Sequence, residues 1–262
     1  VVTASFVSQR GTIAYATAIR KADPDALIAG PAEWGWTGYM FSGKDSELSN
    51  AKFKTTPDRK AHGDVPFLEW YLKKLAEHEK TSGVKMLDLL DVHIYPQADN
   101  VQMGEEDGSG DGAGATDKKT NDLRLRTTRS LWDREYKDES WIDQPVYLIP
   151  RMKDLIAANY PGLGFQIGEY NFGAEKHING AVAQAETFGR FAQFGVSHAF
   201  YWTFPKKNTP VYWSFRAFRN YDGAGGHFGD TIVPSSSPSG TSLFASRDES
   251  GKKWVLVALN FS

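Results

Sequence analysis

Apolar residues recur along this chain with two different periods. Six segments place an apolar residue at every third or fourth position, which predicts helices over 12–22, 66–82, 122–136, 146–160, 180–194 and 211–221. Four apolar runs between them predict buried strands at 26–29, 86–95, 165–170 and 197–202. Strands that alternate with helical segments indicate βα units around a parallel sheet. The pattern therefore predicts an α/β fold.

The pattern changes after Asp222 and Gly223. Two short strands are predicted at 242–247 and 253–259, and the charged turn 248–251 joins them. A change from βα units to paired strands indicates a domain boundary. We therefore assign residues 1–226 to a βα domain and residues 227–262 to the first strands of a separate β-sheet domain.

Composition excludes several classes of protein. The 262 residues include 30 Lys and Arg against 32 Asp and Glu, a formal charge of −2, so we expect no nucleic-acid partner. No run approaches the roughly 18–20 consecutive apolar residues of a membrane span, and we expect no membrane partner. The chain has no cysteine, which excludes a thiol nucleophile, a disulfide framework and a cysteine zinc site.

Aromatic residues make up 13% of the chain, and several follow the predicted strands. In parallel βα folds, functional groups collect at the C-terminal ends of the strands. Those ends carry Trp34, Trp36, His93, Tyr95, Glu169, Tyr170, Asn171 and Trp202. A groove with these side chains suits a neutral, polyhydroxylated ligand, because aromatic rings stack on flat apolar faces. It does not suit a phosphate, because no strand end carries a glycine-rich phosphate loop or a basic cluster.

Glu169 ends the third predicted strand, after apolar Phe165 and Ile167 at strand spacing. A carboxylate at the end of a buried strand is either a hydrogen-bonded structural group or a functional one, because burying it unpaired is costly. Both interpretations stay open on position alone. Trp70, Trp213 and Trp254 fall within predicted helices or strands, and we expect them in the core.

A series of motifs, in order from about residue 11 onward, resembles glycoside hydrolase family 44. They are LIAGP at 27–31, WGW at 34–36, DVHIYP at 91–96, RSLWD at 129–133, GEYNFG at 168–173, HING at 177–180 and NYDG at 220–223. The resemblance implies a (β/α)8 barrel of the TIM type that carries a β-sandwich. The four predicted strands then correspond to strands 5–8, the C-terminal half of the barrel, followed by the start of the sandwich.

The same resemblance implies a secreted, retaining endo-β-1,4-glucanase that acts on cellulose-type glucans or xyloglucan, with xylan cleaved by some members. The nucleophile of the family lies in its Glu-Tyr-Asn motif, which maps onto Glu169. His93 and Tyr95 share one face of their strand and would line the cleft beside it. Trp202 would form a platform under a sugar ring, and at least one aromatic residue of the loop around Trp34 and Trp36 would stack on sugar.

A retaining glycosidase also needs an acid/base carboxyl about 5–5.5 Å from its nucleophile. In family 44 this group sits in an Asn-Glu-Pro motif at the end of strand 4, and this sequence contains no Asn-Glu pair. Glu33 is the nearby substitute; its other role would be to accept a sugar hydroxyl or to anchor a loop. We expect the chain to lack strands 1–4, to be truncated at both ends and to show little activity alone. Two competing interpretations are an inactive sugar-binding segment and a half-barrel completed by a partner segment.

Metal signals in the sequence are weak. Residues 107–112 resemble the first half of a calcium loop, but Lys118 stands where a bidentate glutamate is required, so a flexible loop is favoured over structural calcium. The six histidines lack the spacing of a catalytic zinc site. We therefore expect no cofactor, and the oligomeric state stays open.

Overall fold

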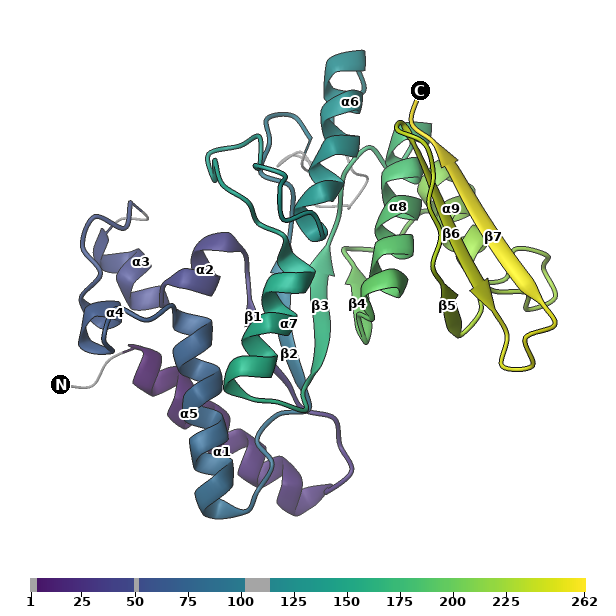
Figure 1. The fold of residues 1–262 in the computed structure, drawn as a ribbon. Helices are drawn as coiled ribbons and strands as arrows, with labels where there is room; N and C mark the ends of the chain where they lie inside the picture. The colour runs from purple at the N-terminus through teal and green to yellow at the C-terminus, as the bar shows by residue number, and fades with distance from the viewer. Residues whose placement is uncertain (1–3, 50–51, 102–113) are drawn as a thin grey trace. The chain divides into compact units, whose positions relative to one another are not determined.

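The computed structural model describes residues 4–49, 52–101 and 114–262. The chain forms two compact units, each made of three stretches. Unit 1 comprises Val1–Ile94, Pro150–Glu169 and Ser197–Phe200, and unit 2 comprises Tyr95–Ile149, Tyr170–Val196 and Tyr201–Ser262. Figure 1 shows the elements in order along the chain.

A four-stranded sheet lies mainly in unit 1. Its strands, in the order β1-β2-β3-β4, are Ala29–Glu33, Leu89–Ile94, Gly164–Tyr170 and His198–Tyr201. β1 and β2 pair in parallel, with Ala29 opposite Leu89. Strands in chain order, joined by helical connections, confirm the predicted α/β class of a partial barrel.

The helices of unit 1 are α1 (Ala4–Ala22), α2 (Trp36–Met40), α3 (Gly43–Ser49), α4 (Pro57–Ala61), α5 (Phe67–Ser82) and most of α7 (Leu148–Asn159). α5 buries Leu68, Leu72 and Leu75 at helical spacing, and it ends at Gly83, whose left-handed backbone has φ 72°. On β2, Leu90 and Val92 lie on one face and are fully buried. Asp91 and His93 therefore point to the opposite face of the strand.

β1 begins three residues later than the sequence predicts. The apolar run at 26–28 lies outside the regular ladder: Arg20 donates to the carbonyl of Ala26, the Asp88 carboxylate accepts the amide of Ile28 at 2.8 Å, and the carbonyl of Ile28 accepts the amide of Asp88 at 2.8 Å. The ladder with β2 starts only at Ala29. Residues 34–41, predicted as a loop, include the short helix α2.

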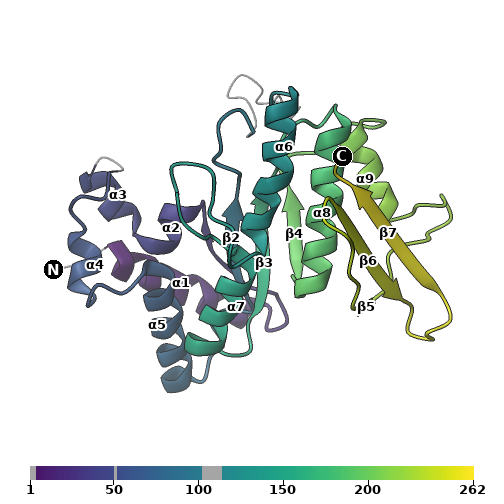
Figure 2. The same ribbon diagram turned by 45° about the horizontal axis from the view of Figure 1, so that its top comes forward.

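Unit 2 places an antiparallel sheet against two helices. Its elements are α6 (Lys118–Thr127), the 3-10 helix η1 (Thr128–Leu131), α8 (Ile178–Phe194), α9 (Pro210–Phe218), β5 (Thr231–Val233), β6 (Thr241–Arg247) and β7 (Trp254–Asn260). α8 and α9 lie side by side against the sheet in Figure 1 and in the turned view of Figure 2. Their common core contains Ala185, Phe218, Phe228 and Phe244. The domain boundary at residue 226 stays a prediction.

Tryptophan positions differ in part from expectation. Trp70 is buried, as predicted, but Trp213 and Trp254 expose 53% and 54% of their surface. Trp254 lies on the face of β7 opposite Val255 and Val257, which pack against the core of unit 2. Within the described ranges, no helix has the length and apolar character needed to cross a membrane.

Arg124 joins four segments of unit 2 from a fully buried position on α6. Its guanidinium donates to the carbonyls of Ala115 at 2.7 Å and Phe172 at 3.0 Å, and to the side-chain oxygens of Asn121 at 3.0 Å and Asn179 at 2.9 Å. Burial lowers the pKa of Arg124 to about 10. Four neutral oxygens thus accept hydrogen bonds from this buried cation.

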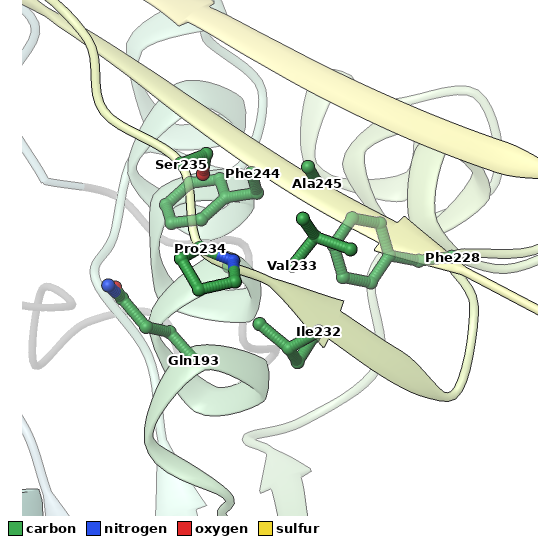
Figure 3. Close-up of a pocket in the computed structure, with 9 residues that line it drawn as sticks. Gln193, Phe228, Ile232, Val233, Pro234, Ser235, Phe244 and Ala245 are labelled. Atoms are coloured by element: carbon green, nitrogen blue, oxygen red, sulfur yellow. The ribbon is translucent and has the colours of Figure 1, made fainter. Parts of the chain in front are cut away.

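A small hollow of about 20 Å³ lies between α8 and the strands β5 and β6 (Figure 3). Its lining is mostly apolar and includes Phe228, Ile232 and Phe244, with Gln193 from α8. No titratable side chain is among these lining residues. The hollow therefore offers packing space and no catalytic chemistry.

Candidate active site

The ends of β2 and β3 bring His93 and Glu169 together in unit 1. Nδ1 of His93 lies 3.5 Å from Oε2 of Glu169, and both side chains are half-buried. Adjacent parallel strands end at the same edge of a sheet, which explains how residues 76 positions apart meet. An imidazole beside a carboxylate can orient it and, when protonated, stabilise its charge.

Asp91 lies on the same face of β2 as His93 and is almost completely buried. A Cβ atom at Gly168 would come within 2.5 Å of Oδ1 of Asp91, so glycine is needed where β3 passes this carboxyl. Burial raises the pKa of Asp91 above its ordinary value; a hydrogen bond from Gln166 and the charge of His93 oppose the rise. The sequence patterns did not single out Asp91, although its place two residues before His93 puts both on one face.

Glu33 does not join this group. A β-bulge between Pro31 and Glu33 shifts the register of β1, so that Glu33 pairs with Val92 and not with a residue of the Asp91 face. Oε2 of Glu33 lies 2.2 Å from the position that a Cβ atom of Gly38 would occupy. The Glu33 carboxyl therefore packs against α2. Burial raises the pKa of Glu33 to about 7. Of its predicted roles, this position favours a loop anchor over an acid/base partner for Glu169.

The two tryptophans after β1 differ in environment. Trp34 exposes 58% of its surface, which leaves a ring face open to a ligand. Trp36 begins α2 and is engaged on both sides: the Arg151 guanidinium lies 5.0 Å from its ring centroid, and Tyr39 meets it edge-on at 6.2 Å. Tyr39 also donates its hydroxyl hydrogen bond to the carbonyl of His93. α2 is thus tied to the strand that carries His93.

In unit 2, Tyr170 and Asn171 are buried. The Tyr170 hydroxyl accepts a hydrogen bond from Nε2 of Gln184 at 2.9 Å. Asn171 accepts the amide of Gly173 at 2.7 Å and donates to the carbonyl of Trp202. Both side chains form hydrogen bonds inside the fold, and their expected contact with a ligand stays a prediction. The hydrogen bond from Asn171 supports the backbone at the exposed Trp202 from inside unit 2.

Tyr95 and Trp202 remain accessible in the same unit. Tyr95 is half-buried, and its carbonyl accepts a hydrogen bond from Gln97 at 3.1 Å. Trp202 exposes 45% of its surface, and its amide donates to the carbonyl of Tyr170 at 3.0 Å. Trp202 therefore lies beside the residue that follows Glu169 in the chain.

No group of three or more His, Asp or Glu side chains that could hold a metal is found among the described residues. The segment 107–112, which resembles part of a calcium loop, lies outside the described residues. The expectation that this segment is a loop and not a calcium site therefore stays a prediction.

Comparison with known proteins agrees with this geometry. A sequence profile of glycoside hydrolase family 44 matches residues 5–98. Endoglucanase A of Paenibacillus lautus is 32% identical over 260 residues, covering 95% of this chain and 35% of that protein. The chain therefore spans about a third of this curated relative.

Solved structures extend the similarity to the fold. CelM2, a bifunctional glucanase-xylanase from a metagenome library, matches with a TM-score of 0.90 and 38% identity over 97% of this chain and 47% of its own. A Paenibacillus polymyxa xyloglucanase of family 44 matches with a TM-score of 0.81 and 29% identity over 99% of this chain and 49% of its own. Both matches support the partial barrel followed by an antiparallel sheet.

Proposed function

We propose that this chain, which belongs to glycoside hydrolase family 44, carries the nucleophile side of a retaining endo-β-1,4-glucanase. Glu169 would attack the anomeric carbon of the sugar, and the glycosidic oxygen would leave as a covalent glycosyl-enzyme forms. The observation that carries the proposal is the contact between His93 and Glu169 at the ends of neighbouring strands.

Each residue around Glu169 has a place in this chemistry. A nucleophilic carboxylate must be held still, and His93, whose Nδ1 lies 3.5 Å from Oε2 of Glu169, can orient it. Tyr39 fixes the backbone of His93 through its carbonyl. Asp91 packs beneath, against Gly168, and so supports the backbone from which Glu169 projects.

We assign no acid/base residue among the residues that the structure describes. Glu33 pairs with Val92 and faces away from Asp91 and His93. The sequence also lacks the Asn-Glu pair that the family uses for this role. The chain alone should therefore cleave natural glucans slowly or not at all, because an alkoxide is a poor leaving group without a proton donor.

The proposed substrate is a neutral β-1,4-glucan, such as cellulose or xyloglucan. Each unit by itself offers rings that can stack on sugar: Trp34 is exposed in unit 1, and in unit 2 Trp202 is exposed and Tyr95 half-buried. The relatives bear names such as endoglucanase, glucanase-xylanase and xyloglucanase. An extracellular location is part of the proposal, because a long glucan polymer is degraded outside the cell.

A second function is sugar binding without turnover. It is favoured by the exposed aromatic rings, whose stacking on a sugar needs no acid/base group. The two functions differ in whether Glu169 forms a covalent bond to the ligand.

Labelling of Glu169 tests the proposal directly. The full chain is incubated with 2,4-dinitrophenyl 2-deoxy-2-fluoro-β-cellobioside, whose phenolate leaves without a proton while fluorine slows the next step. We expect mass spectrometry to find the sugar on the peptide that contains Glu169, and Glu169→Gln to reduce labelling at least about 100-fold, because an amide is a poor nucleophile. Glu33→Gln serves as the matched control and should label normally.

Two outcomes would contradict the proposal. A label on another carboxylate would remove Glu169 from the nucleophile role. Absence of label in a chain that still binds cello-oligosaccharides would leave sugar binding as the function. Turnover of xyloglucan that Glu169→Gln abolishes would support the nucleophile but contradict the expected inactivity of the chain alone.

A further inference from the structure

Glu33 and the short helix α2 are in close contact within unit 1. A Cβ atom at Gly38 of α2 would overlap with Oε2 of Glu33 and would lie 3.2 Å from Nε1 of Trp34. Only glycine therefore lets the Glu33 carboxyl approach the backbone of the helix so closely. A change in the space that this carboxyl needs acts directly on α2.

Helix α2 in turn holds the strand that carries His93. Tyr39 follows Gly38, is 2% exposed and donates its hydroxyl hydrogen bond to the carbonyl of His93. Nδ1 of His93 lies 3.5 Å from Oε2 of Glu169. Because a hydrogen bond is lost beyond roughly 3.5 Å, a small displacement of α2 is enough to release the backbone of His93. Direct contacts thus lead from Glu33 through α2 to the side chain of Glu169.

The surroundings of Glu33 favour its neutral form. Burial raises its pKa from 4.5 to about 7, and within the described ranges no cation or hydrogen-bond donor opposes that rise. The titratable groups that face it are the hydroxyls of Tyr39 on α2 and Tyr71 on α5, whose pKa values are raised by burial and further by the charge of Glu33. On β2, Glu33 lies opposite the apolar Val92. Glu33 is thus the group of this cluster that titrates near neutral pH.

Loss of the Glu33 proton has to change this arrangement. A carboxylate needs water or hydrogen-bond donors, and burying it without them is costly. A conformation that raises the pKa of a carboxyl becomes less favourable once that carboxyl is ionised. Above pH 7, conformations in which Glu33 is separated from α2 and reaches water therefore gain population.

We propose that neutral Glu33 is a positioning residue, which keeps α2 in place so that Tyr39 can hold His93. Ionised Glu33 releases α2, and His93 then no longer orients Glu169. The role of Glu169 in this pH response rests on the proposed function. The site is ordered at pH 6 and loosened at pH 8.

The rate of labelling by the fluorinated cellobioside at pH 6 and pH 8 tests the pH response, because its phenolate leaves without an acid catalyst. With a pKa of about 7, about nine-tenths of Glu33 is neutral at pH 6 and about one-tenth at pH 8, so the wild-type rate should fall about fivefold to ninefold. Glu33→Gln stays neutral and should be labelled equally at both pH values. Glu47→Gln, which removes an exposed carboxyl of unit 1, is the matched control and should keep the wild-type fall.

Tyr39→Phe tests the route through α2. It removes the donor to the carbonyl of His93, so labelling should be several-fold slower at pH 6 and should show no further fall at pH 8. Adding Glu33→Gln to it should change nothing more. Circular dichroism checks that each variant folds. A purely structural Tyr39 would leave the ratio of the two rates as it is in the wild type.

Amide hydrogen exchange reports on α2 without any reaction at Glu169. The amide of Phe41 is bonded to the carbonyl of Thr37 at the end of the helix. After correction for the intrinsic base-catalysed rate, protection of α2 should fall more between pH 6 and pH 8 than protection of α5 in the wild type. In Glu33→Gln, α2 should keep its protection at both pH values.

The results separate the pH response from the proposed function. Labelling of Glu169 at equal rates at both pH values, or a wild-type ratio of rates in Tyr39→Phe, would overturn the pH response and leave the nucleophile standing. Equal protection of α2 at both pH values would also overturn it, whether or not Glu169 is labelled. Release of α2 at pH 8 in a chain that is never labelled would keep the role of Glu33 toward α2 and overturn the nucleophile.

Discussion

Glu33 is a half-buried carboxyl that stands apart from His93 and Glu169. Its pKa rises from 4.5 to about 7 because burial disfavours the charged form. A folded-state pKa above the unfolded value means that the native protein binds the proton more tightly. The resulting cost to stability is absent below pH 4.5, grows between pH 4.5 and 7, and is complete above pH 7.

We therefore expect Glu33→Gln to stabilise the chain in a pH-dependent way. At pH 8 the free energy of unfolding should rise by about 2–3 kcal/mol, because the amide needs no deprotonation, and at pH 4 it should hardly change. Urea denaturation at the two pH values measures the difference. Glu249→Gln, at an exposed position, should show no such pH dependence. An equal effect of Glu33→Gln at both pH values would contradict this explanation.

The contact between α8 and β6 depends on one small residue. A Cβ atom at Gly189 would lie 2.2 Å from the ring of Phe244, and that ring belongs to the core shared by the helices and the antiparallel sheet. Helix α8 therefore needs glycine at position 189, although glycine within a helix lowers stability by up to about 1 kcal/mol relative to alanine. Close packing of strand on helix outweighs helix propensity here.

Gly189→Ala should destabilise the chain by about 1–3 kcal/mol, because the added methyl overpacks the core. Gly11→Ala in α1 is the control: nothing lies within 4 Å of its Cβ position, so it should be neutral or slightly stabilising. Thermal unfolding of both variants provides the comparison. Adding Phe244→Leu to Gly189→Ala should recover part of the loss; a further additive loss would exclude steric overlap as the cause.

At the scale of the whole molecule, helix period and strand order could be predicted from the sequence, and side-chain direction could not. The caps of α5 and the apolar run of β3 are local signals, so their bounds were predicted within one residue. The bulge that turns Glu33 away is set by pairing with β2, which no local pattern reveals. Trp213 and Trp254 show the same limit, because their exposure depends on which face of an element meets the core.

In the candidate site, too, strand ends could be predicted from the sequence and side-chain directions could not. Glu169 and His93 could be placed together from strand ends alone. Tyr170 and Asn171 lie in the same motif, yet their side chains turn inward to Gln184 and to the carbonyl of Trp202.

The hydrogen bonds of Arg124 have a consequence for how unit 2 opens. One guanidinium holds the segments that contain Ala115, Asn121, Phe172 and Asn179, so none of them can separate without leaving buried donors unsatisfied. These segments should therefore unfold as one cooperative block, with similar opening free energies in amide hydrogen exchange. Arg124→Lys, which offers fewer donors, should split the block into regions that exchange independently. Unchanged joint exchange in that variant would mean that packing alone holds the block together.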